Sequence, residues 1–266
     1  MTDAARDAAR AAERSPVMRG LARGGYAANG VVHGVLGAII IAISLGGSGE
    51  PDQAGAFDAL SAVPLGLAGV WLLAGLLGAL ALWHAAQAVL VRGRDLRAWG
   101  RRVSPLAQSL VYVALSGIAV TVALGARLDG DRSAREASEG LLATPGGVFV
   151  LGAAGLGIAI AGIAFASIGV RRSFDKVVRI PDGGRGVTLN VVAVIGYIGK
   201  GVAIGIVGIL LLVAAFRQEA RAAGGMDAAV HALLEQTLGP LLVFLVGLGL
   251  LSYTVFSFFR VRYAKL

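Results

Sequence analysis

The residues best suited to chemistry in this sequence lie inside its apolar stretches, where a polar side chain is costly. Tyr26, Asn29 and His33 occupy positions i, i+3 and i+7, so a helix places their side chains on one face. Hydroxyl, amide and imidazole groups there can bind a ligand or hydrogen-bond to a neighbouring helix. The spacing therefore predicts a polar layer inside an otherwise apolar bundle.

The same helix face recurs in two later stretches, at offsets of 79 and 171 residues. Gln108 and Lys200 then take the position of Asn29, so all three copies carry a large hydrogen-bonding side chain there. His84, near the end of the second apolar stretch, can approach this layer at a similar depth. The predicted ligand- or ion-facing layer consists of Asn29, His33, His84, Gln108, Tyr112 and Lys200.

Lys200 is the only charged side chain well inside a predicted span. A lysine at the centre of a bilayer costs roughly 2.5–3.5 kcal/mol on insertion scales, and less if its ammonium group reaches the interface. Two roles stay open for it: a snorkelling, structural lysine, or one that faces a ligand or ion. No Asp or Glu lies within any predicted span, which disfavours proton- or sodium-coupled transport and favours an anion, a polar neutral group or a lipid headgroup.

The sequence offers little for catalysis. Its histidines, at 33, 84 and 231, form no i, i+4 pair and no H-E-x-x-H motif. His33 and His84 together lack the carboxylate or thiolate that a metal site would need, and the chain contains no cysteine. Serines in the apolar stretches have no paired histidine and acid. We therefore expect no catalytic residue, no metal, no cofactor and no enzymatic activity.

The elements that must position these residues are long apolar helices. The chain is 56% hydrophobic and only 15% charged, whereas soluble domains carry about 25% charged residues. Runs of about 20 apolar residues can cross ~30 Å of hydrocarbon as helices. The predicted spans are 24–46, 64–91, 104–126, 144–170, 188–216 and 238–259. The expected fold class is an all-α membrane protein with six transmembrane helices.

The distribution of charge predicts the orientation of these spans. The net charge is +8, and 18 of the 24 Lys and Arg residues fall in the two tails and the two loops that would share one side. Cytoplasmic loops are the basic ones, so both termini are expected in the cytoplasm, with the spans in the cytoplasmic (inner) membrane. The excess charge is thus a topology signal that suits anionic lipid headgroups on the cytoplasmic side, and it is not a nucleic-acid patch.

The chain divides into three two-span repeats. The first span of each is clearest at 25–47, recurs at 196–216, and is more degraded at 105–125. The expected organisation is a polar tail at 1–20, where Pro16 ends any helix, followed by repeats at 21–94, 95–176 and 177–266. In each outer loop, alternating apolar and polar residues predict a short helix that leads into the second span.

Glycines four apart predict close helix packing, because small residues let helix backbones approach each other in a membrane. The residues concerned are Gly30, Gly34, Gly37, Gly201, Gly205 and Gly208. The same glycines could instead line a lumen.

These repeats resemble the domain of unknown function family numbered 1206, bacterial membrane proteins predicted to carry three such units. The resemblance rests on the pattern G-Y-x-x-x-G-V-V-x-G and on an outer loop that ends L-x-x-x-P-x-G. The matching residues are Gly25, Tyr26, Gly30, Val31, Val32, Gly34, Leu60, Pro64 and Gly66, with Gly196, Tyr197, Gly201 and Gly205 in the third copy. The middle copy departs at Pro105 and Ser109. The resemblance implies a membrane fold and supplies no activity.

Each repeat has two spans, so all three copies have the same orientation, which predicts a pseudo-threefold ring of six helices about an axis along the membrane normal. Two functions then stay open. One is permeation of a small solute or anion through the central polar layer. The alternative is a structural or accessory membrane protein without transport activity, whose polar layer only ties the bundle together.

Overall fold

The computed structural model describes residues 3–91, 93 and 95–264. This part of the chain forms ten α-helices and two 3₁₀ helices, and it contains no strand beyond the isolated bridge between Val178 and Ala264. The short helices are α1 (Asp3–Arg14), α3 (Gln53–Ser61), α6 (Gly130–Leu142), η1 (Ser173–Lys176), η2 (Ala220–Ala222) and α9 (Met226–Leu234). The long ones are α2 (Pro16–Ser44), α4 (Gly66–Leu90), α5 (Leu96–Ala123), α7 (Gly147–Val170), α8 (Gly184–Arg217) and α10 (Gly239–Tyr263).

The six long helices are all long and apolar enough to cross a membrane, as the sequence predicts. Their ends extend beyond several of the predicted spans, because arginine and alanine continue a helix past its apolar run. Thus α2 begins at Pro16 rather than at residue 24. Pro16 does end the tail helix: α1 stops at Arg14, and the Ser15 hydroxyl then accepts a hydrogen bond from the Met18 N–H at 3.3 Å to start α2. The tail itself packs against α4.

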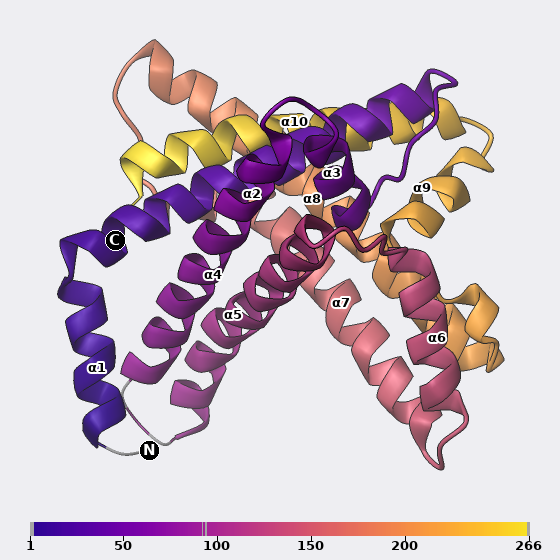
Figure 1. The fold of residues 1–266 in the computed structure, drawn as a ribbon, viewed down its shortest axis with the longest axis horizontal. Helices are drawn as coiled ribbons and strands as arrows, with labels where there is room; N and C mark the ends of the chain where they lie inside the picture. The colour runs from indigo at the N-terminus through magenta and orange to yellow at the C-terminus, as the bar shows by residue number, and fades with distance from the viewer. Residues whose placement is uncertain (1–2, 92, 94, 265–266) are drawn as a thin grey trace.

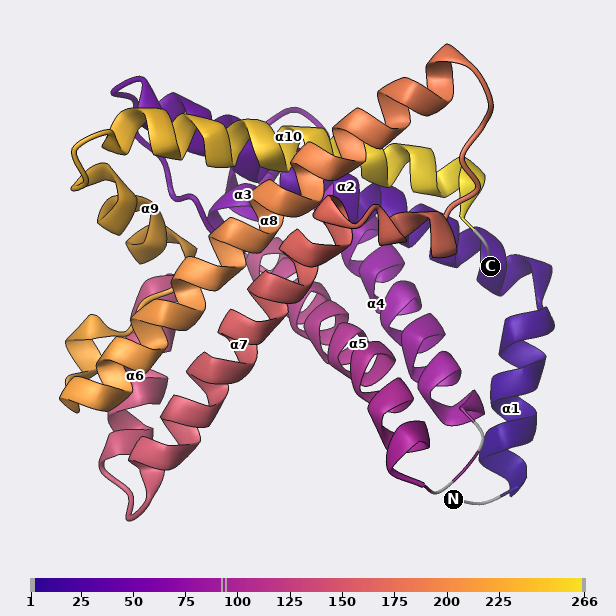
Figure 2. The ribbon, with the colours of Figure 1, turned by 180° about the vertical axis from the view of Figure 1, so that it is seen from behind.

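The long helices associate most closely as three antiparallel pairs, α2 with α10, α4 with α5, and α7 with α8 (Figures 1 and 2). Each pair joins the second span of one repeat to the first span of the next, and α10 returns to α2. The two spans of the middle repeat, α5 and α7, barely touch. The tight packing units therefore cross the repeat boundaries, and no repeat is a self-contained hairpin.

Two of the three pairs cross at glycines in equivalent places. A Cβ atom added to Gly37 of α2 would lie 2.9 Å from the carbonyl oxygen of Gly247 in α10. One added to Gly208 of α8 would lie 2.9 Å from the carbonyl oxygen of Gly155 in α7. Any side chain at these positions would push the helices apart, so glycine is required for the close approach.

The third pair uses serine at the same register. Ser116 of α5, at the repeat position of Gly37, donates a hydrogen bond to the Ala74 carbonyl oxygen of α4 at 2.9 Å. Two turns away, Ser109, at the repeat position of Gly30, donates to the Ala81 carbonyl oxygen at 3.0 Å. The two hydroxyls join α5 to α4 by hydrogen bonds, which stabilise contacts between helices in lipid.

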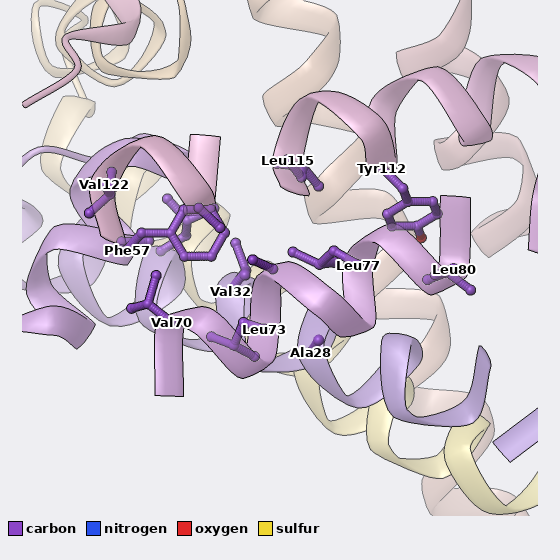
Figure 3. Close-up of a cluster of buried hydrophobic side chains, with 14 of the residues drawn as sticks. Ala28, Val32, Phe57, Val70, Leu73, Leu77, Leu80, Tyr112, Leu115 and Val122 are labelled. Carbon is purple, nitrogen blue, oxygen red and sulfur yellow. The ribbon is translucent and has the colours of Figure 1, made fainter. Parts of the chain in front are cut away.

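The main apolar core lies where α2, α3, α4 and α5 meet (Figure 3). Phe57 of the short helix α3 is fully buried there with Val32 of α2, Val70 of α4 and Val122 of α5. By contrast, the spans expose many large apolar side chains on their outer faces, among them Leu72, Phe149 and Ile163. Such exposure suits lipid as the surrounding solvent.

The short helices α3, α6 and α9 each precede a second span, as predicted for the outer loops. Two aspartates link them across repeats. Asp52, the N-cap of α3, accepts hydrogen bonds from the N–H groups of Gly55 at 2.7 Å and of Gly130, the first residue of α6, at 3.0 Å. Asp131 in α6 accepts from the N–H of Gly225, before α9, at 2.7 Å. The outer loops of all three repeats are therefore joined.

Candidate functional site

Buried aromatic side chains and partly buried cationic ones, from five of the six spans, gather where the helix pairs meet. We call this group the tyrosine–cation cluster. Its members are Tyr26, His33, His84, Tyr112, Tyr197, Lys200, Tyr253 and Arg260. They come from α2, α4, α5, α8 and α10, so the cluster exists only after all three repeats have assembled.

His84 connects the first two repeats within this cluster. Its ring stacks on Tyr112 of α5, with centroids 5.5 Å apart, and meets the edge of Tyr26 of α2 at 6.5 Å. His84 is only 4% exposed, and neither ring nitrogen has a well-formed hydrogen bond among the described residues, although Gln87 lies nearby. Figure 3 shows Tyr112 from α5 beside Leu80 of α4, with the apolar core continuing away from it.

Lys200 lies between aromatic rings from two other helices. Its ammonium nitrogen is 4.2 Å from the ring centroid of Tyr253 in α10 and 5.0 Å from that of Phe165 in α7. The side chain therefore contributes a cation to the aromatic cluster. Such contacts are worth ~2 kcal/mol or more when both groups are out of water.

Arg260 provides the second cation. Its guanidinium carbon is 3.9 Å from the ring centroid of Tyr26, which joins the end of α10 to the start of α2. Arg260 and Lys200 also both interact with the Tyr253 side chain. The Nε atom of Arg260 is buried and has no hydrogen-bond partner among the described residues.

Asn29 and His33 occupy the α2 side of the cluster. The His33 ring lies 4.9 Å from that of Tyr253, and its Nδ1 hydrogen-bonds to the Asn29 carbonyl oxygen at 2.8 Å. Asn29 is only 2% exposed, and its side-chain Nδ2 has no partner in the described part of the chain. An unsatisfied buried amide group of this kind costs ~1–3 kcal/mol.

No carboxylate balances the two cations. The six spans contain no Asp or Glu, and none of the ion pairs among the described residues involves Lys200 or Arg260. A buried cation is normally paired, because its desolvation is otherwise expensive. Here only π faces and neutral hydroxyls surround the charges, so the cluster carries net positive charge and suits an anion.

Gln108 is not drawn into the cluster by any contact in the structure. Its amide nitrogen donates to the Ser104 hydroxyl at 3.1 Å and to the Ser104 carbonyl oxygen at 3.4 Å, both one turn back on α5. The three repeat-equivalent positions thus have different surroundings: Asn29 is buried, Lys200 lies among aromatic rings, and Gln108 is bonded along its own helix. Of the predicted layer, the structure brings together His33, His84, Tyr112 and Lys200, with Asn29 beside them.

Sequence reasoning missed three members of the cluster, Tyr197, Tyr253 and Arg260. Arg260 lies one residue beyond the predicted last span, so the count of basic residues assigns it to the C-terminal tail. In the structure, α10 continues to Tyr263 and includes Arg260. The repeat offsets offered a signal, since Tyr197 takes the position of Tyr26 in the third copy. No comparable signal marks Tyr253, because its importance comes from the packing of α10 against α8 and α2.

The predicted packing glycines lie at helix crossings, Gly205 included, since a Cβ added to Gly162 of α7 would lie 2.6 Å from the Gly205 backbone nitrogen. Gly30, Gly34 and Gly37 face α10, where added Cβ atoms would meet Thr254, Ser257 or Gly247. Gly201 and Gly208 face α7, with Gly201 close to the Gly162 carbonyl oxygen at 2.6 Å from an added Cβ. An added Cβ at Gly205 would meet nothing within 4 Å. The crossing geometry therefore depends on some of these glycines and tolerates change at others.

The fold and the cluster define a multi-pass α-helical membrane protein built from three tandem two-span repeats. Residues 24–90, 103–172 and 195–264 each match the family described as Domain of Unknown Function (DUF1206), and the chain belongs to that family. It is also 26% identical, over 252 residues, to a protein of Bacillus subtilis (strain 168) named "Uncharacterized protein YxxB". That match covers 92% of this chain and 90% of the Bacillus protein. No solved structure matches the chain.

Proposed function

We propose that this protein binds a small anion in the tyrosine–cation cluster and lets it pass through the membrane, without catalysis. The observation that supports this is the pair of partly buried cations, Lys200 and Arg260, in a cluster that contains no carboxylate. An anion entering between them would neutralise their charge in a low-dielectric setting, where the attraction is strong. The hydroxyls of Tyr26, Tyr112 and Tyr253 and the free Asn29 amide can donate hydrogen bonds to it.

The proposal includes the arrangement in the membrane. The equivalent crossings of the three helix pairs, at Gly37, Ser116 and Gly208, support a pseudo-threefold axis that passes near the cluster. The concentration of basic residues in the tails and in the loops after α4 and α7 supports cytoplasmic termini in the cytoplasmic membrane. An anion would then reach the cluster from either side along the contacts between pairs.

Anion flux into liposomes containing the purified protein tests the proposal. Lys200→Gln should lower chloride or nitrate flux roughly tenfold or more, because it removes one charged hydrogen-bond donor from the site. Lys176→Gln, which removes the same group from an exposed position in η1, is the matched control and should leave flux unchanged. Absence of flux in the wild-type protein, or equal flux in wild type and Lys200→Gln, would refute permeation through the cluster.

Thiol accessibility provides a second readout that does not depend on the choice of anion. The chain has no cysteine, so Asn29→Cys and Lys200→Cys can be labelled singly with a membrane-impermeant reagent. Permeation requires that both react in the folded protein. If they react only after denaturation, the cluster is dry and the proposal fails.

A structural role is the second candidate, and the cation–π contacts favour it. Lys200 and Arg260 between them link α2, α7, α8 and α10, so they could serve only to hold the bundle together. On that account Lys200→Gln should lower the unfolding temperature in detergent, with no flux to lose in wild type. Measuring flux and unfolding on the same variants separates the two functions.

A further inference from the structure

A pocket of about 440 Å³ opens beyond the tyrosine–cation cluster, between the start of α2 and the end of α10. It lies about one helical turn from the cluster, since Arg23 precedes Tyr26 by three residues and Arg262 follows Arg260 by two. The lining residues are Arg19, Arg23, Arg179, Ile180, Pro181, Arg262, Tyr263 and Ala264. Pockets that hold small organic ligands have volumes of about 300–1,000 Å³, so this one has room for more than a single ion.

The wall of this pocket is fixed by backbone contacts. The Arg179 N–H donates to the Tyr263 carbonyl oxygen at 2.8 Å, and Val178 forms an antiparallel bridge with Ala264. Behind this segment, Phe174 and Val178 are buried against Tyr197 and Phe256 of the spans. The segment after η1 is therefore tied to the end of α10, and it presents Arg179 beside Arg262 without having to fold on binding.

The chemistry of the lining is strongly one-sided. Four of its eight residues are arginines and none is acidic. Among the described residues, Arg23, Arg179 and Arg262 take part in none of the ion pairs. Guanidinium groups bind phosphate oxygens in pairs of parallel hydrogen bonds, and several arginines around one pocket are the usual way to hold a phosphomonoester.

We propose that this pocket binds a phosphomonoester group, held by Arg23, Arg179 and Arg262. The pocket lies at the ends of two apolar helices, where a span would leave the lipid, so the group can belong to an acidic lipid or to a soluble phosphate ester. Binding there would clamp α2, α10 and the segment after η1 together. The site is separate from the tyrosine–cation cluster, and its assignment does not depend on anion permeation.

Calorimetric titration of the full-length protein in a neutral detergent tests the assignment with two probes that share one headgroup. Dihexanoyl phosphatidic acid represents the lipid source, and glycerol 3-phosphate the soluble source. The double variant Arg179→Gln/Arg262→Gln should weaken binding roughly tenfold or more, because it removes two charge-assisted contacts. Arg97→Gln/Arg171→Gln removes the same charge from exposed arginines outside the pocket and should change the affinity less than about twofold.

Binding of the lipid probe alone would assign the pocket to a lipid headgroup, and equal binding of both probes would assign it to the phosphate group itself. Absence of saturable binding of either probe would overturn the proposal. An equal loss of affinity in the two double variants would overturn it too, because it would indicate only general electrostatic attraction. Arg23→Gln, on the other wall, gives an independent variant if the double one is poorly folded. If the pocket fails to bind phosphate while anion flux is intact, the proposed role of the tyrosine–cation cluster is unaffected. If flux is absent while phosphate binds, the proposed phosphate site is unaffected.

Discussion

At the scale of single residues, the protein stabilises two partly buried cations without acids. The guanidinium of Arg260 lies over the Tyr26 ring, and the ammonium of Lys200 lies over that of Tyr253. A ring face attracts a cation through its quadrupole but leaves the charge formally uncompensated. This differs from a buried salt bridge, where the acid would compete with an incoming anion. The arrangement therefore holds the cations in place by aromatic rings and without an acid.

Substitutions at Tyr26 should reveal how far the ring face matters. Tyr26→Leu should destabilise the protein by about 1–2 kcal/mol beyond the change in packing, because Arg260 loses its aromatic partner. Tyr26→Phe keeps the ring and should change stability little. Thermal unfolding in detergent is the measurement. If Phe and Leu were equally damaging, the hydroxyl rather than the ring face would be what holds Arg260.

At the scale of helices, the crossings decide which glycines the fold needs. Gly201 and Gly205 belong to the same predicted small-residue row on α8, yet only Gly201 has a backbone neighbour within contact distance of an added Cβ. A row of glycines on a helix predicts a packing face but does not predict which turn touches the partner. That depends on the crossing angle, which the sequence of α8 alone does not encode.

The two glycines therefore form a matched pair for mutagenesis. Gly201→Ala should destabilise the protein by about 1–3 kcal/mol, since the methyl group would meet the α7 backbone at 2.6 Å. Gly205→Ala should be neutral or stabilising by up to about 1 kcal/mol, because alanine favours the helix. Chemical unfolding of both variants in the same detergent makes the comparison. Similar losses in both would show that Gly205 faces a close neighbour too, and no loss in Gly201→Ala would show that the α7–α8 crossing is not as close as the structure has it.

At the scale of the whole molecule, the loops that carry α3, α6 and α9 join the three repeats to one another. Glu50, Asp52, Asp129 and Asp227, from all three repeats, surround a small pocket of about 90 Å³. Partial burial, together with the neighbouring carboxylates of Asp52 and Asp129, raises the pKa of Glu50 above its usual value. The pKa of Asp227 is raised too, by burial foremost, against the opposing pull of His231. These acids repel one another when all are ionised.

Stability should therefore depend on pH through these loops. A carboxyl whose pKa is raised on folding stabilises the protein at low pH, and this stability is lost as the pH rises through the folded pKa. Glu50→Gln should accordingly raise the unfolding temperature at pH 7, with the gain vanishing by about pH 4, where the native glutamate is itself protonated. Glu139→Gln, exposed on α6, is the control for removing an acid elsewhere. A gain that is the same at every pH would contradict this account.

The sequence by itself determined the six spans, the three repeats, the short outer helices and the family, because apolar length and repeat offsets are local or periodic properties. It also marked His33, His84, Tyr112 and Lys200 as exceptional, since a polar group in a span stands out against its neighbours. Only the tertiary structure decided which of the marked residues meet. The tightest pairs join different repeats, and Gln108 bonds to Ser104 on its own helix while Arg260 reaches Tyr26 from the far end of the chain. Those contacts depend on how the packed helices rotate and cross, and the sequence of a single helix encodes neither.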